Sequence, residues 1–475
     1  MTTRLLFVEP PKDFWFVMGE YLPPPTGLLA LAAYVERELP DVEIGVVDCQ
    51  AEGKGWTELE KSIESFSPSI VAASGLTCNA YVCAKVAELA KKVDERIVTI
   101  VGGQHFSAIP EDSLKAFPEI DYIVRGEGEQ TLVELIRALE QAKGFSDIRG
   151  LSFRNDGRFI HASPRPLIDD LDSLPFPAYH FLGRNIAKYH FTMMAGRNTR
   201  YLILEGSRGC NYRCSFCTQW QHWGGTWRTK SAKRIADELE YLQRDLGGQL
   251  LWLTDDNFDY ARRGKALWQE LKGRKFAREL DWFFQARMDD IVRHPGLVAN
   301  MHEVGNSWIL MGVESDSPER LKEFNKGVAV SPAARAVKIL NDNDIFSQST
   351  FIIGSRKDTE ESIEQLRRFS MNLDTYLAIF AVLTPFPGTD IYQEAERNGW
   401  LEDRNFAHYD MAHAIMPTES LSKNDVQREL YDCYNDFYGS MVRGLSGLLS
   451  KNKVKRRMYR HMAKKGVLRS LRNLI

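Results

Sequence analysis

Three cysteines within eight residues are the part of this sequence whose types and spacing most directly predict chemistry. Cys210, Cys214 and Cys217 stand in a C-x3-C-x2-C spacing. Three thiolates on one loop can each bind a different iron of a four-iron, four-sulfur cluster, which leaves the fourth iron without a protein ligand. The spacing therefore predicts a metal centre with one open coordination position.

Two other roles remain open for these cysteines. A structural zinc ion takes four protein ligands, and His222 could supply the fourth beside the three thiolates. The thiols could also belong to a hydrophobic core, because free cysteine is among the most buried residue types. The iron and zinc contents of the purified protein distinguish these roles.

The composition is that of an ordinary globular protein. The chain has 475 residues, of which 44% are hydrophobic and 26% are charged, and this length allows two or three domains. A formal net charge of -3 gives no reason to expect nucleic acid. Seven cysteines are too few for a disulfide scaffold, and we find neither a signal peptide nor an apolar run that could span a bilayer. We expect a cytoplasmic protein.

An α/β fold is predicted by the alternation of short β-rich runs with helical patterns. Over residues 1–145, about five such strands predict a doubly wound, Rossmann-like domain with a parallel sheet. Prolines and acidic residues then predict an extended linker over residues 146–195. Six further βα repeats over residues 196–395 predict a partial (β/α)6 TIM-like barrel, with its chemistry at the carboxyl ends of the strands. Residues 396–475 are expected to form a helical C-terminal region.

The cysteine segment resembles that of the radical S-adenosylmethionine (SAM) superfamily, in which an aromatic residue, here Phe216, precedes the last cysteine. In that family the open iron binds SAM, and electron transfer into the sulfonium releases methionine and a 5′-deoxyadenosyl radical. The resemblance continues in order along the barrel and implies SAM contacts from Phe216, Asp255, Asp256, Asn257, Arg287 and Glu314. It assigns no catalytic residue beyond the cluster ligands. Residues 354–359 depart from the glycine-proline form common in the family.

The first domain is similar to the cobalamin-binding domain that many radical SAM enzymes carry. The similarity lies in three loops rich in small residues, and it implies cobalamin contacts from Ser74, Leu76, Thr77, Gly102, Gly103, Gln104, His105, Gly126 and Glu127. The D-x-H-x-x-G signature that places histidine beneath cobalt is absent. We therefore expect His105 near the corrin edge or tail, and a lower cobalt face without a protein nitrogen ligand. A flavodoxin-like domain that binds no ligand remains the alternative.

Together the two resemblances imply an anaerobic, cobalamin-dependent radical SAM enzyme that functionalises an unactivated carbon. Methyl transfer to a hydrophobic small molecule is the leading hypothesis, with a low-potential ferredoxin or flavodoxin as electron donor. Residues 218–223 also resemble a stretch of the anaerobic magnesium-protoporphyrin monomethyl ester oxidative cyclases, so oxidative cyclisation of a tetrapyrrole is the first alternative. Trp220 and Trp223 could form a flat wall for such a substrate or pack internally. A non-catalytic corrin-binding or metal-binding regulator is the second alternative.

The C-terminal end is basic. No Asp or Glu follows residue 450, and ten cations alternate with apolar residues: Lys451, Lys453, Lys455, Arg456, Arg457, Arg460, Lys464, Lys465, Arg469 and Arg472. Basic amphipathic helices can lie on anionic membranes, so we weigh a peripheral membrane contact through this tail against a solvated helix with a basic face. No RNA-recognition signature accompanies the basic residues.

Overall fold

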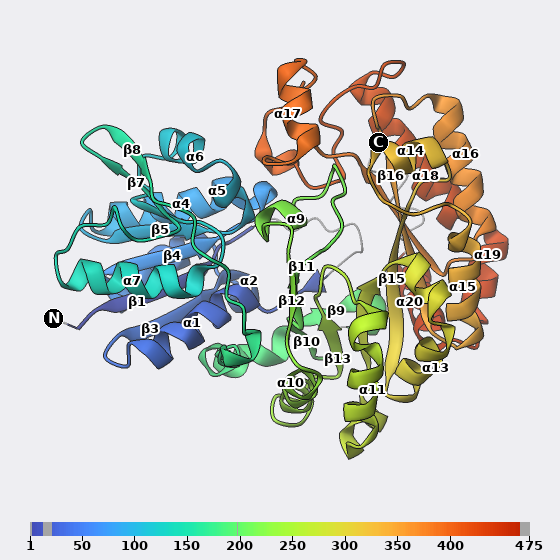
Figure 1. The fold of residues 1–475 in the computed structure, drawn as a ribbon, viewed down its shortest axis with the longest axis horizontal. Coiled ribbons are helices and arrows are strands. Elements are labelled where there is room, and N and C mark those ends of the chain that lie inside the picture. The colour runs from blue at the N-terminus through green and yellow to red at the C-terminus, as the bar shows by residue number, and fades with distance from the viewer. Residues whose placement is uncertain (1, 13–20, 197, 466–475) are drawn as a thin grey trace.

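The computed structural model describes residues 2–12, 21–196 and 198–465. They form an N-terminal α/β domain, a barrel-like α/β domain beside it, and a group of C-terminal helices packed on the barrel (Figure 1). The predicted α/β class and the order of the parts along the chain are confirmed.

The N-terminal domain is built on a seven-stranded sheet with the order β3-β1-β4-β5-β6-β7-β8. Its five parallel strands are β1 (Arg4–Glu9), β3 (Glu43–Asp48), β4 (Ile70–Ser74), β5 (Val98–Gly102) and β6 (Tyr122–Val124). Alternate side chains of β1 enter opposite cores: Leu5 packs with α1 (Thr26–Glu38) and α7 (Gly128–Glu140), whereas Leu6 packs with α3 (Trp56–Phe66) and α4 (Ala80–Val93). Both faces are therefore covered, as a doubly wound fold requires.

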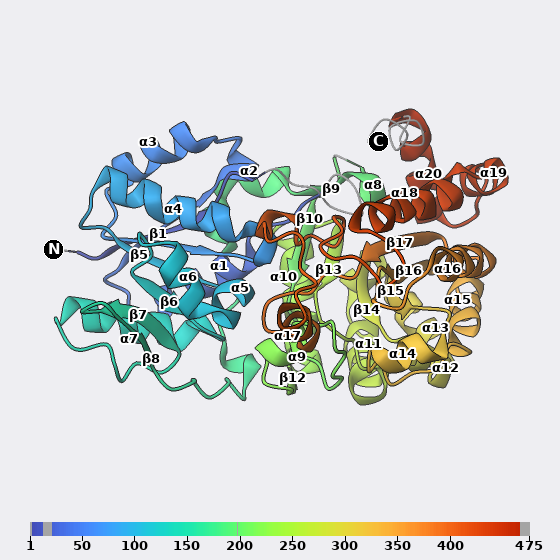
Figure 2. The same cartoon turned by 90° about the horizontal axis from the view of Figure 1, so that it is seen from above.

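The barrel consists of six parallel strands whose spatial order follows their order in the chain. They are β10 (Tyr201–Leu204), β13 (Leu250–Leu253), β14 (Trp282–Ala286), β15 (Asn306–Glu314), β16 (Phe346–Ile353) and β17 (Leu377–Val382). The connecting helices on the outside include α10 (Ala232–Arg244), α11 (Lys265–Lys272), α13 (Pro295–Glu303), α15 (Pro332–Asp342) and α16 (Glu360–Asn372) (Figures 1 and 2). In the described part of the chain β10 and β17 stay unpaired with each other, so the barrel is open, as predicted.

The extended linker expected over residues 146–195 is wrong for much of its length. Residues 151–161 form the antiparallel strands β7 (Leu151–Asn155) and β8 (Arg158–His161), which extend the N-terminal sheet beyond β6. Farther along, β9 (His190–Phe191) pairs with β2 (Tyr21–Leu22), and Tyr179 is buried with its hydroxyl donating to the Ile203 carbonyl at 2.6 Å. Residues from this stretch thus belong to the N-terminal sheet and to the contact between the two domains.

The C-terminal region contains α18 (Lys423–Gly439), α19 (Met441–Leu448) and α20 (Lys453–Lys465). In α20 the apolar side chains Val454, Met458 and Met462 are at most 8% exposed, because they pack into the barrel's hydrophobic core. The apolar face of this basic helix is therefore covered by the protein itself and is not available to a membrane. The expected membrane contact through the basic residues of the tail stays a prediction, and Arg469 and Arg472 lie outside the described residues. Among the described residues, no helix combines the length and apolar character needed to cross a membrane.

Candidate active site

The cysteine loop begins immediately after a short two-stranded ribbon at the mouth of the barrel. β11 (Ser207–Gly209) pairs with β12 (Trp227–Thr229), and Gly209 takes a φ of 91° directly before Cys210. A Cβ at Gly209 would collide with the Thr226 carbonyl oxygen, so glycine permits the close approach of the two strands. Farther along the loop, the Ser215 amide donates to the Phe324 carbonyl at 3.0 Å. The loop is thereby held by the ribbon at its start and by the barrel at Ser215.

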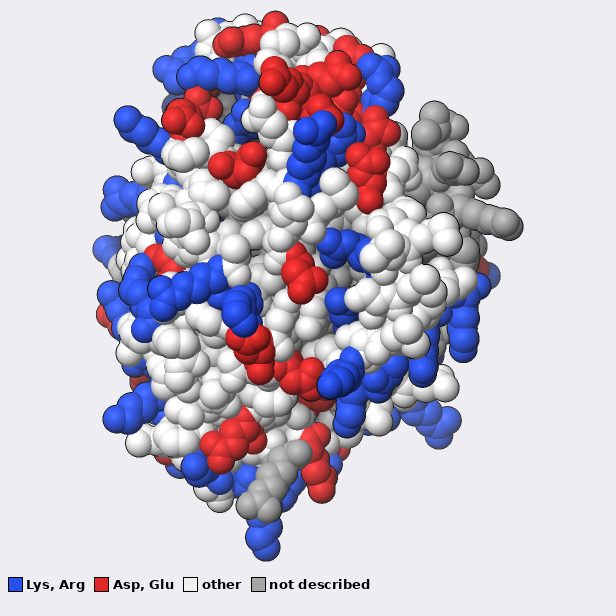
Figure 3. All heavy atoms as spheres, turned by 90° about the vertical axis from the view of Figure 1, so that its right-hand side faces the viewer, with Lys and Arg blue, Asp and Glu red and all other residues white. Residues whose placement is uncertain are grey.

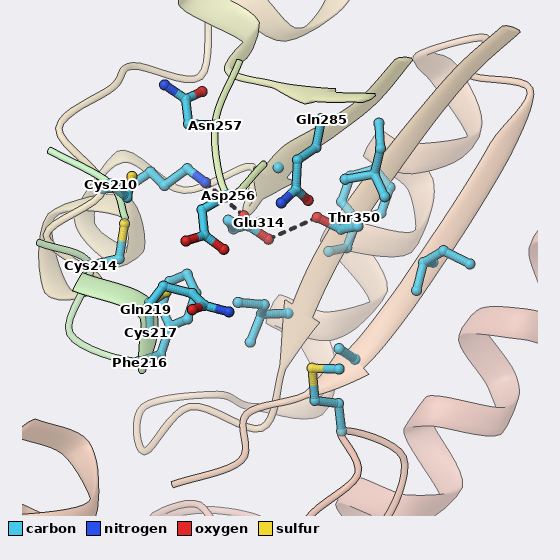
Figure 4. Close-up of a pocket in the computed structure, with 18 of the residues that line it drawn as sticks. Cys210, Cys214, Phe216, Cys217, Gln219, Asp256, Asn257, Gln285, Glu314 and Thr350 are labelled. Carbon is cyan, nitrogen blue, oxygen red and sulfur yellow. Dashed lines mark hydrogen bonds and ion pairs between the residues drawn. The ribbon is translucent and has the colours of Figure 1, made fainter. Parts of the chain in front are cut away.

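The cysteine loop forms one wall of a cavity of about 440 Å³ inside the barrel mouth, which we call the barrel cavity. Figure 4 shows Cys210, Cys214 and Cys217 on this wall, with Asp256, Glu314 and Thr350 across from them. Further polar or aromatic residues also line it, among them Tyr212, Phe216, Gln219, Asn257, Gln285, Arg287, Lys326 and Gln348. Five of the six residues expected to contact SAM, together with all three cysteines, are therefore brought to a single cavity.

The three thiols fit a cubane cluster better than a single zinc ion. Burial is the main cause that raises the pKa of each thiol, and it raises that of Cys217 to about 12. Among the described residues, no three His, Cys, Asp or Glu side chains already converge on one point as zinc ligands do. His222, the proposed fourth zinc ligand, lines a separate cavity with Arg125 and Arg165. A cubane accepts thiolates that reach separate irons, so separated thiols on one wall suit it.

Glu314 and Lys326 form a buried ion pair in the barrel cavity. Lys326 Nζ donates to Glu314 Oε1 at 2.7 Å, and Thr350 Oγ1 donates to Glu314 Oε2 at 3.1 Å. Burial alone would lower the pKa of Lys326, but the Glu314 carboxylate outweighs it and the pKa is raised. Glu314 has a φ of 66° at a shift of register between β15 and β16. This strained backbone turns the carboxylate inwards, where a Cβ on Gly312 would collide with the pair.

Of three further polar side chains in the barrel cavity, Asp256 has a perturbed pKa, Asn257 has an unsatisfied oxygen, and Arg287 is held by its neighbours. Burial, assisted by the charge of Glu205, raises the pKa of Asp256 to about 7. Asn257 Oδ1 is buried and has no hydrogen-bond partner among the described residues. The Arg287 guanidinium lies 3.6 Å from the centre of the Tyr212 ring, and its Nε donates to Asp289 Oδ1 at 3.0 Å. A polar ligand is the physical means of satisfying such groups.

Asp255 does not line the barrel cavity, so the structure does not bring it together with the other five residues expected to contact SAM. Its side chain is fully buried and accepts hydrogen bonds from the Gly206 amide at 2.7 Å and the Ser207 amide at 2.9 Å, and it pairs with Arg263. The carboxylate therefore holds the segment that leads into the cysteine loop.

A second cavity, of about 610 Å³, lies at the carboxyl ends of the N-terminal strands and is closed by the barrel; we call it the N-terminal cavity. Seven of the nine residues expected to contact cobalamin line it: Ser74, Leu76, Gly102, Gly103, Gln104, Gly126 and Glu127. The barrel contributes Ile203, Glu205, Arg208, Trp223 and Thr254 to the opposite wall. A large, mainly apolar cavity with a few polar groups fits a flat organic cofactor.

Thr77 and His105 are the two expected cobalamin contacts that do not line the N-terminal cavity. His105 is 1% exposed, packs against Phe106 and Phe406, and has both ring nitrogens without a partner among the described residues. Burial lowers its pKa to about 4, so the ring is neutral. His105 therefore lies outside the lining of the N-terminal cavity, and none of the described residues that line the cavity is a histidine.

Gly103 is required by the close approach of two loops. Its φ is 92°, and a Cβ there would lie 2.7 Å from the Gly75 carbonyl oxygen. The loops after β4 and β5 can approach each other only because this residue lacks a side chain. Gly126, with a φ of 69°, faces open space instead.

A buried charge network joins the cysteine loop to the N-terminal domain. Arg208 donates to Glu127 at 2.7 Å and to Glu129 at 2.6 Å, and all three side chains are at most 6% exposed. Arg228 Nη1 also lies 2.9 Å from Glu127. Arg208 is only two residues before Cys210, so the network fixes the cysteine loop relative to the N-terminal cavity.

Neither tryptophan of the 218–223 stretch lines the barrel cavity. Trp220 donates from Nε1 to the Cys214 carbonyl at 3.0 Å, and the Arg213 guanidinium lies over its ring. Trp223 lines the N-terminal cavity instead. The two rings therefore do not form a paired wall of the barrel cavity: Trp220 packs internally, and Trp223 belongs to the other cavity.

Several residues of the barrel cavity were missed from the sequence. Lys326 lies in a loop with no motif to mark it, and only its contact with Glu314 reveals its position. Gln348, Thr350 and Ile352 alternate along β16 and all face the cavity. Polar residues at a period of two inside a buried strand are the signal that could have identified the first two.

Comparison with known proteins gives two family matches: the radical SAM superfamily over residues 204–370 and the B12 binding domain over residues 18–136. An uncharacterised methyltransferase of Pyrococcus horikoshii is 31% identical over 437 residues, which are 92% of this chain and 92% of the relative. The anaerobic magnesium-protoporphyrin IX monomethyl ester cyclase of Rubrivivax gelatinosus is 28% identical over 445 residues, which are 92% of this chain and 77% of the cyclase.

Two solved structures share the whole fold. The radical SAM methyltransferase TsrM from Kitasatospora setae, with cobalamin and a 4Fe-4S cluster bound, has a TM-score of 0.72 and 18% identity, and the match covers 100% of both chains. The cobalamin-dependent SAM radical enzyme OxsB, with aqua-cobalamin and SAM bound, has a TM-score of 0.74 and 18% identity, and the match covers 98% of this chain and 71% of OxsB.

Proposed function

The chain belongs to the radical SAM superfamily, in the group that carries a B12-binding domain, and on this basis we propose that it is an enzyme that transfers a methyl group to a hydrophobic small molecule. Cys210, Cys214 and Cys217 would hold a 4Fe-4S cluster, and the N-terminal cavity would hold cobalamin. When bound, the cluster supplies the electron that cleaves SAM, and cobalamin carries the methyl group.

The observation that carries the proposal is a hydrogen bond between the walls of the two cavities. Gln104, which lines the N-terminal cavity, donates from Nε2 to Oε1 of Gln219, which lines the barrel cavity, at 2.8 Å. A reaction that uses both cofactors requires both to reach the same substrate atom. Adjacent cavities that share this wall support such an arrangement.

The polar residues of the barrel cavity have separate tasks in this proposal. Lys326 and Arg287 carry positive charge suited to the carboxylate of SAM, while Asn257 Oδ1 is free to accept from an amino or hydroxyl group. Glu314 keeps Lys326 charged through their ion pair. These side chains bind and orient, and the surrounding buried strands exclude water.

The substrate class is inferred from the opposite half of the barrel cavity. There the lining comes mainly from β17 and the loop after it and is apolar: Ile379, Ala381, Val382, Leu383, Phe386 and Met411. A substrate with an apolar body would bury that body against these residues and present its reacting carbon towards the cysteine loop. Reduction of the cluster requires an external donor, for which we propose a low-potential ferredoxin or flavodoxin.

Anaerobic reconstitution with iron, sulfide and hydroxocobalamin tests the proposal. We expect about four irons and one corrin per chain, and release of 5′-deoxyadenosine from SAM on reduction. Cys214→Ala should lose the iron and SAM cleavage but keep the corrin, whereas Cys433→Ala, which changes a buried cysteine of α18, should keep all three. Iron without corrin would remove the methyltransferase proposal. Zinc without SAM cleavage would leave a metal-binding regulator.

The relation to the Rubrivivax cyclase supports a second candidate, oxidative cyclisation of a tetrapyrrole. The two reactions differ in the fate of the SAM methyl group, since the cyclisation does not transfer it. Incubation with methyl-labelled SAM and extracts that contain candidate substrates separates them. Label in an extracted product supports methyl transfer, and a tetrapyrrole product without label supports cyclisation.

A further inference from the structure

Helix α19 (Met441–Leu448) presents an exposed apolar stripe. The exposed fractions are 81% for Met441, 79% for Val442, 58% for Leu445 and 81% for Leu449, which follows the helix. Only three other large hydrophobic side chains in the described part of the chain are exposed, and they are scattered: Leu76, Tyr81 and Met411. At 100° per residue, positions 441, 442, 445 and 449 share one side of a helix. Single exposed apolar residues are ordinary, but a cluster of four marks an interaction surface.

The fold itself holds this stripe outwards. On the inner side of α19, Arg443 donates to the Met371 carbonyl at 2.9 Å and the Thr375 carbonyl at 3.0 Å. Gly447 lies against the Tyr459 ring of α20, where a Cβ would collide with the ring carbons. α19 therefore cannot rotate its apolar side chains inwards without losing these contacts.

Lysines border the apolar stripe. Lys451 and Lys453 directly follow it and are exposed, as are Arg460 and Lys464 on α20. No Asp or Glu occurs in the chain after Asp436. Figure 3 views the side on which α15, α16 and α19 lie in Figure 1, and it shows uncharged areas bordered by Lys and Arg and also by Asp and Glu side chains.

We propose that this α19 surface, made of Met441, Val442, Leu445, Leu449, Lys451 and Lys453, docks on an anionic lipid bilayer. The apolar stripe would enter the boundary between headgroups and acyl chains, and the lysines would pair with acidic headgroups. The apolar residues of α20 take no part, because they are buried. The surface contributes no residue to either cavity, so the proposal stands independently of the reaction.

The position of α19 favours a membrane over an acidic electron donor. A donor must approach the cluster, and the cysteine loop with α9 (Gln219–His222) lies at the junction of the two domains. α19 lies at the opposite end of the barrel, away from the N-terminal domain (Figures 1 and 2). Electron transfer rates fall steeply with distance, so a donor gains nothing by binding there.

Vesicle co-sedimentation of the full-length, reconstituted protein tests the proposal. We expect binding to vesicles of phosphatidylcholine with 30% phosphatidylglycerol, and at least tenfold weaker binding to phosphatidylcholine alone. Leu445→Ser with Leu449→Ser should lower the partition coefficient about tenfold or more. Lys451→Gln with Lys453→Gln should lower it roughly fivefold per lysine, and high salt should do the same.

Matched variants control for folding and for general charge. Leu445→Met with Leu449→Met keeps the apolar stripe and should keep binding, and Lys92→Gln with Lys233→Gln removes two exposed lysines from other helices and should change nothing. A wild-type protein that stays in the supernatant with anionic vesicles overturns the proposal. A second result would also overturn it: a wild-type dimer that becomes a monomer in the Leu445→Ser, Leu449→Ser variant while vesicle binding is unchanged. The apolar stripe would then be the contact between two copies of the chain.

Discussion

Gln104 of the N-terminal domain donates a hydrogen bond of 2.8 Å to Gln219, two residues beyond the last cysteine of the barrel loop. The hydroxyl of Thr218 also lies 3.4 Å from Oε1 of Gln104. The contact connects the two cavities where a shared substrate would have to lie, and the following predictions test what such contacts do.

Loss of the hydrogen bond between Gln104 and Gln219 should uncouple the cleavage of SAM from the transfer of the methyl group to the substrate. We expect Gln219→Ala to leave iron and corrin contents and 5′-deoxyadenosine release unchanged, because the residue is no cluster ligand. The yield of methylated product per 5′-deoxyadenosine should fall roughly fivefold, the effect of one hydrogen bond of about 1 kcal/mol. Both products are measured in one reaction, and an unchanged ratio would show that the bond has no positioning role.

The charge network around Arg208 should dominate the stability of the domain contact. Arg208→Gln leaves Glu129 buried without its charged partner and leaves Glu127 with Arg228 alone, so we expect the free energy of unfolding to fall by about 3 kcal/mol. Arg4→Gln removes an exposed pair with Glu43 and should cost less than about 1 kcal/mol. Urea unfolding of both variants makes the comparison, and equal losses would contradict the burial argument.

Gly312 should be required for the Glu314 to Lys326 pair. A methyl group at this position displaces both side chains, so we expect Gly312→Ala to weaken SAM binding at least tenfold while the iron content stays unchanged. Gly273→Ala is the matched control, because a Cβ there meets only a carbonyl oxygen at 3.8 Å. Equilibrium dialysis with SAM provides the affinities. Normal SAM binding by Gly312→Ala would remove the pair from the SAM site.

Asp48 should make the protein less stable as the pH rises from 4 to 7. Burial raises the pKa of this carboxyl from 3.8 to about 6, although it accepts hydrogen bonds from the Ala51 amide and the Tyr189 hydroxyl. The folded state thus holds a proton that the unfolded state has released, which corresponds to roughly 3 kcal/mol lost through this interval.

The test for Asp48 compares slopes and not absolute stabilities. Asp48→Asn should flatten the dependence of the unfolding free energy on pH between 4 and 7, whatever its effect on the helix cap. Asp94→Asn is the control, because its hydrogen bonds with Arg96 lower the pKa of Asp94 to about 2 and it stays ionised throughout. An identical slope for wild type and Asp48→Asn would refute the assignment.

The sequence was sufficient for the parts of the fold that depend on local patterns. The βα alternation predicted the parallel strands of both sheets, although not β7 and β8, and the cysteine spacing predicted which loop would form the wall of the barrel cavity. It could not separate Asp255 from Asp256, because adjacent residues of a loop point in different directions and the choice depends on the Gly206 and Ser207 amides. The position of Lys326 in the barrel cavity could not be predicted from the sequence for a similar reason, because only folding of the chain brings this residue to Glu314.

The C-terminal helices show that the sequence also could not predict which apolar surfaces are exposed. The periodicity of residues 453–465 correctly indicated that α20 has an apolar face, but it carries no information about what covers that face. The barrel covers the apolar face of α20, and the cluster of exposed apolar residues belongs to α19. The sequence pattern of α19 was too short to predict this exposed cluster. Burial is a property of the partner surface, so it follows only from the tertiary structure.

The pairing of β2 with β9 has a consequence for protein synthesis. Tyr21 and Leu22 leave the ribosome long before His190 and Phe191, their partners in this ribbon, and Tyr21 lines the N-terminal cavity. The wall of that cavity cannot be completed by the first 145 residues alone. A fragment cut at that point would therefore carry an unfinished site, and loading of a cofactor during translation would have to wait until the start of the barrel has emerged.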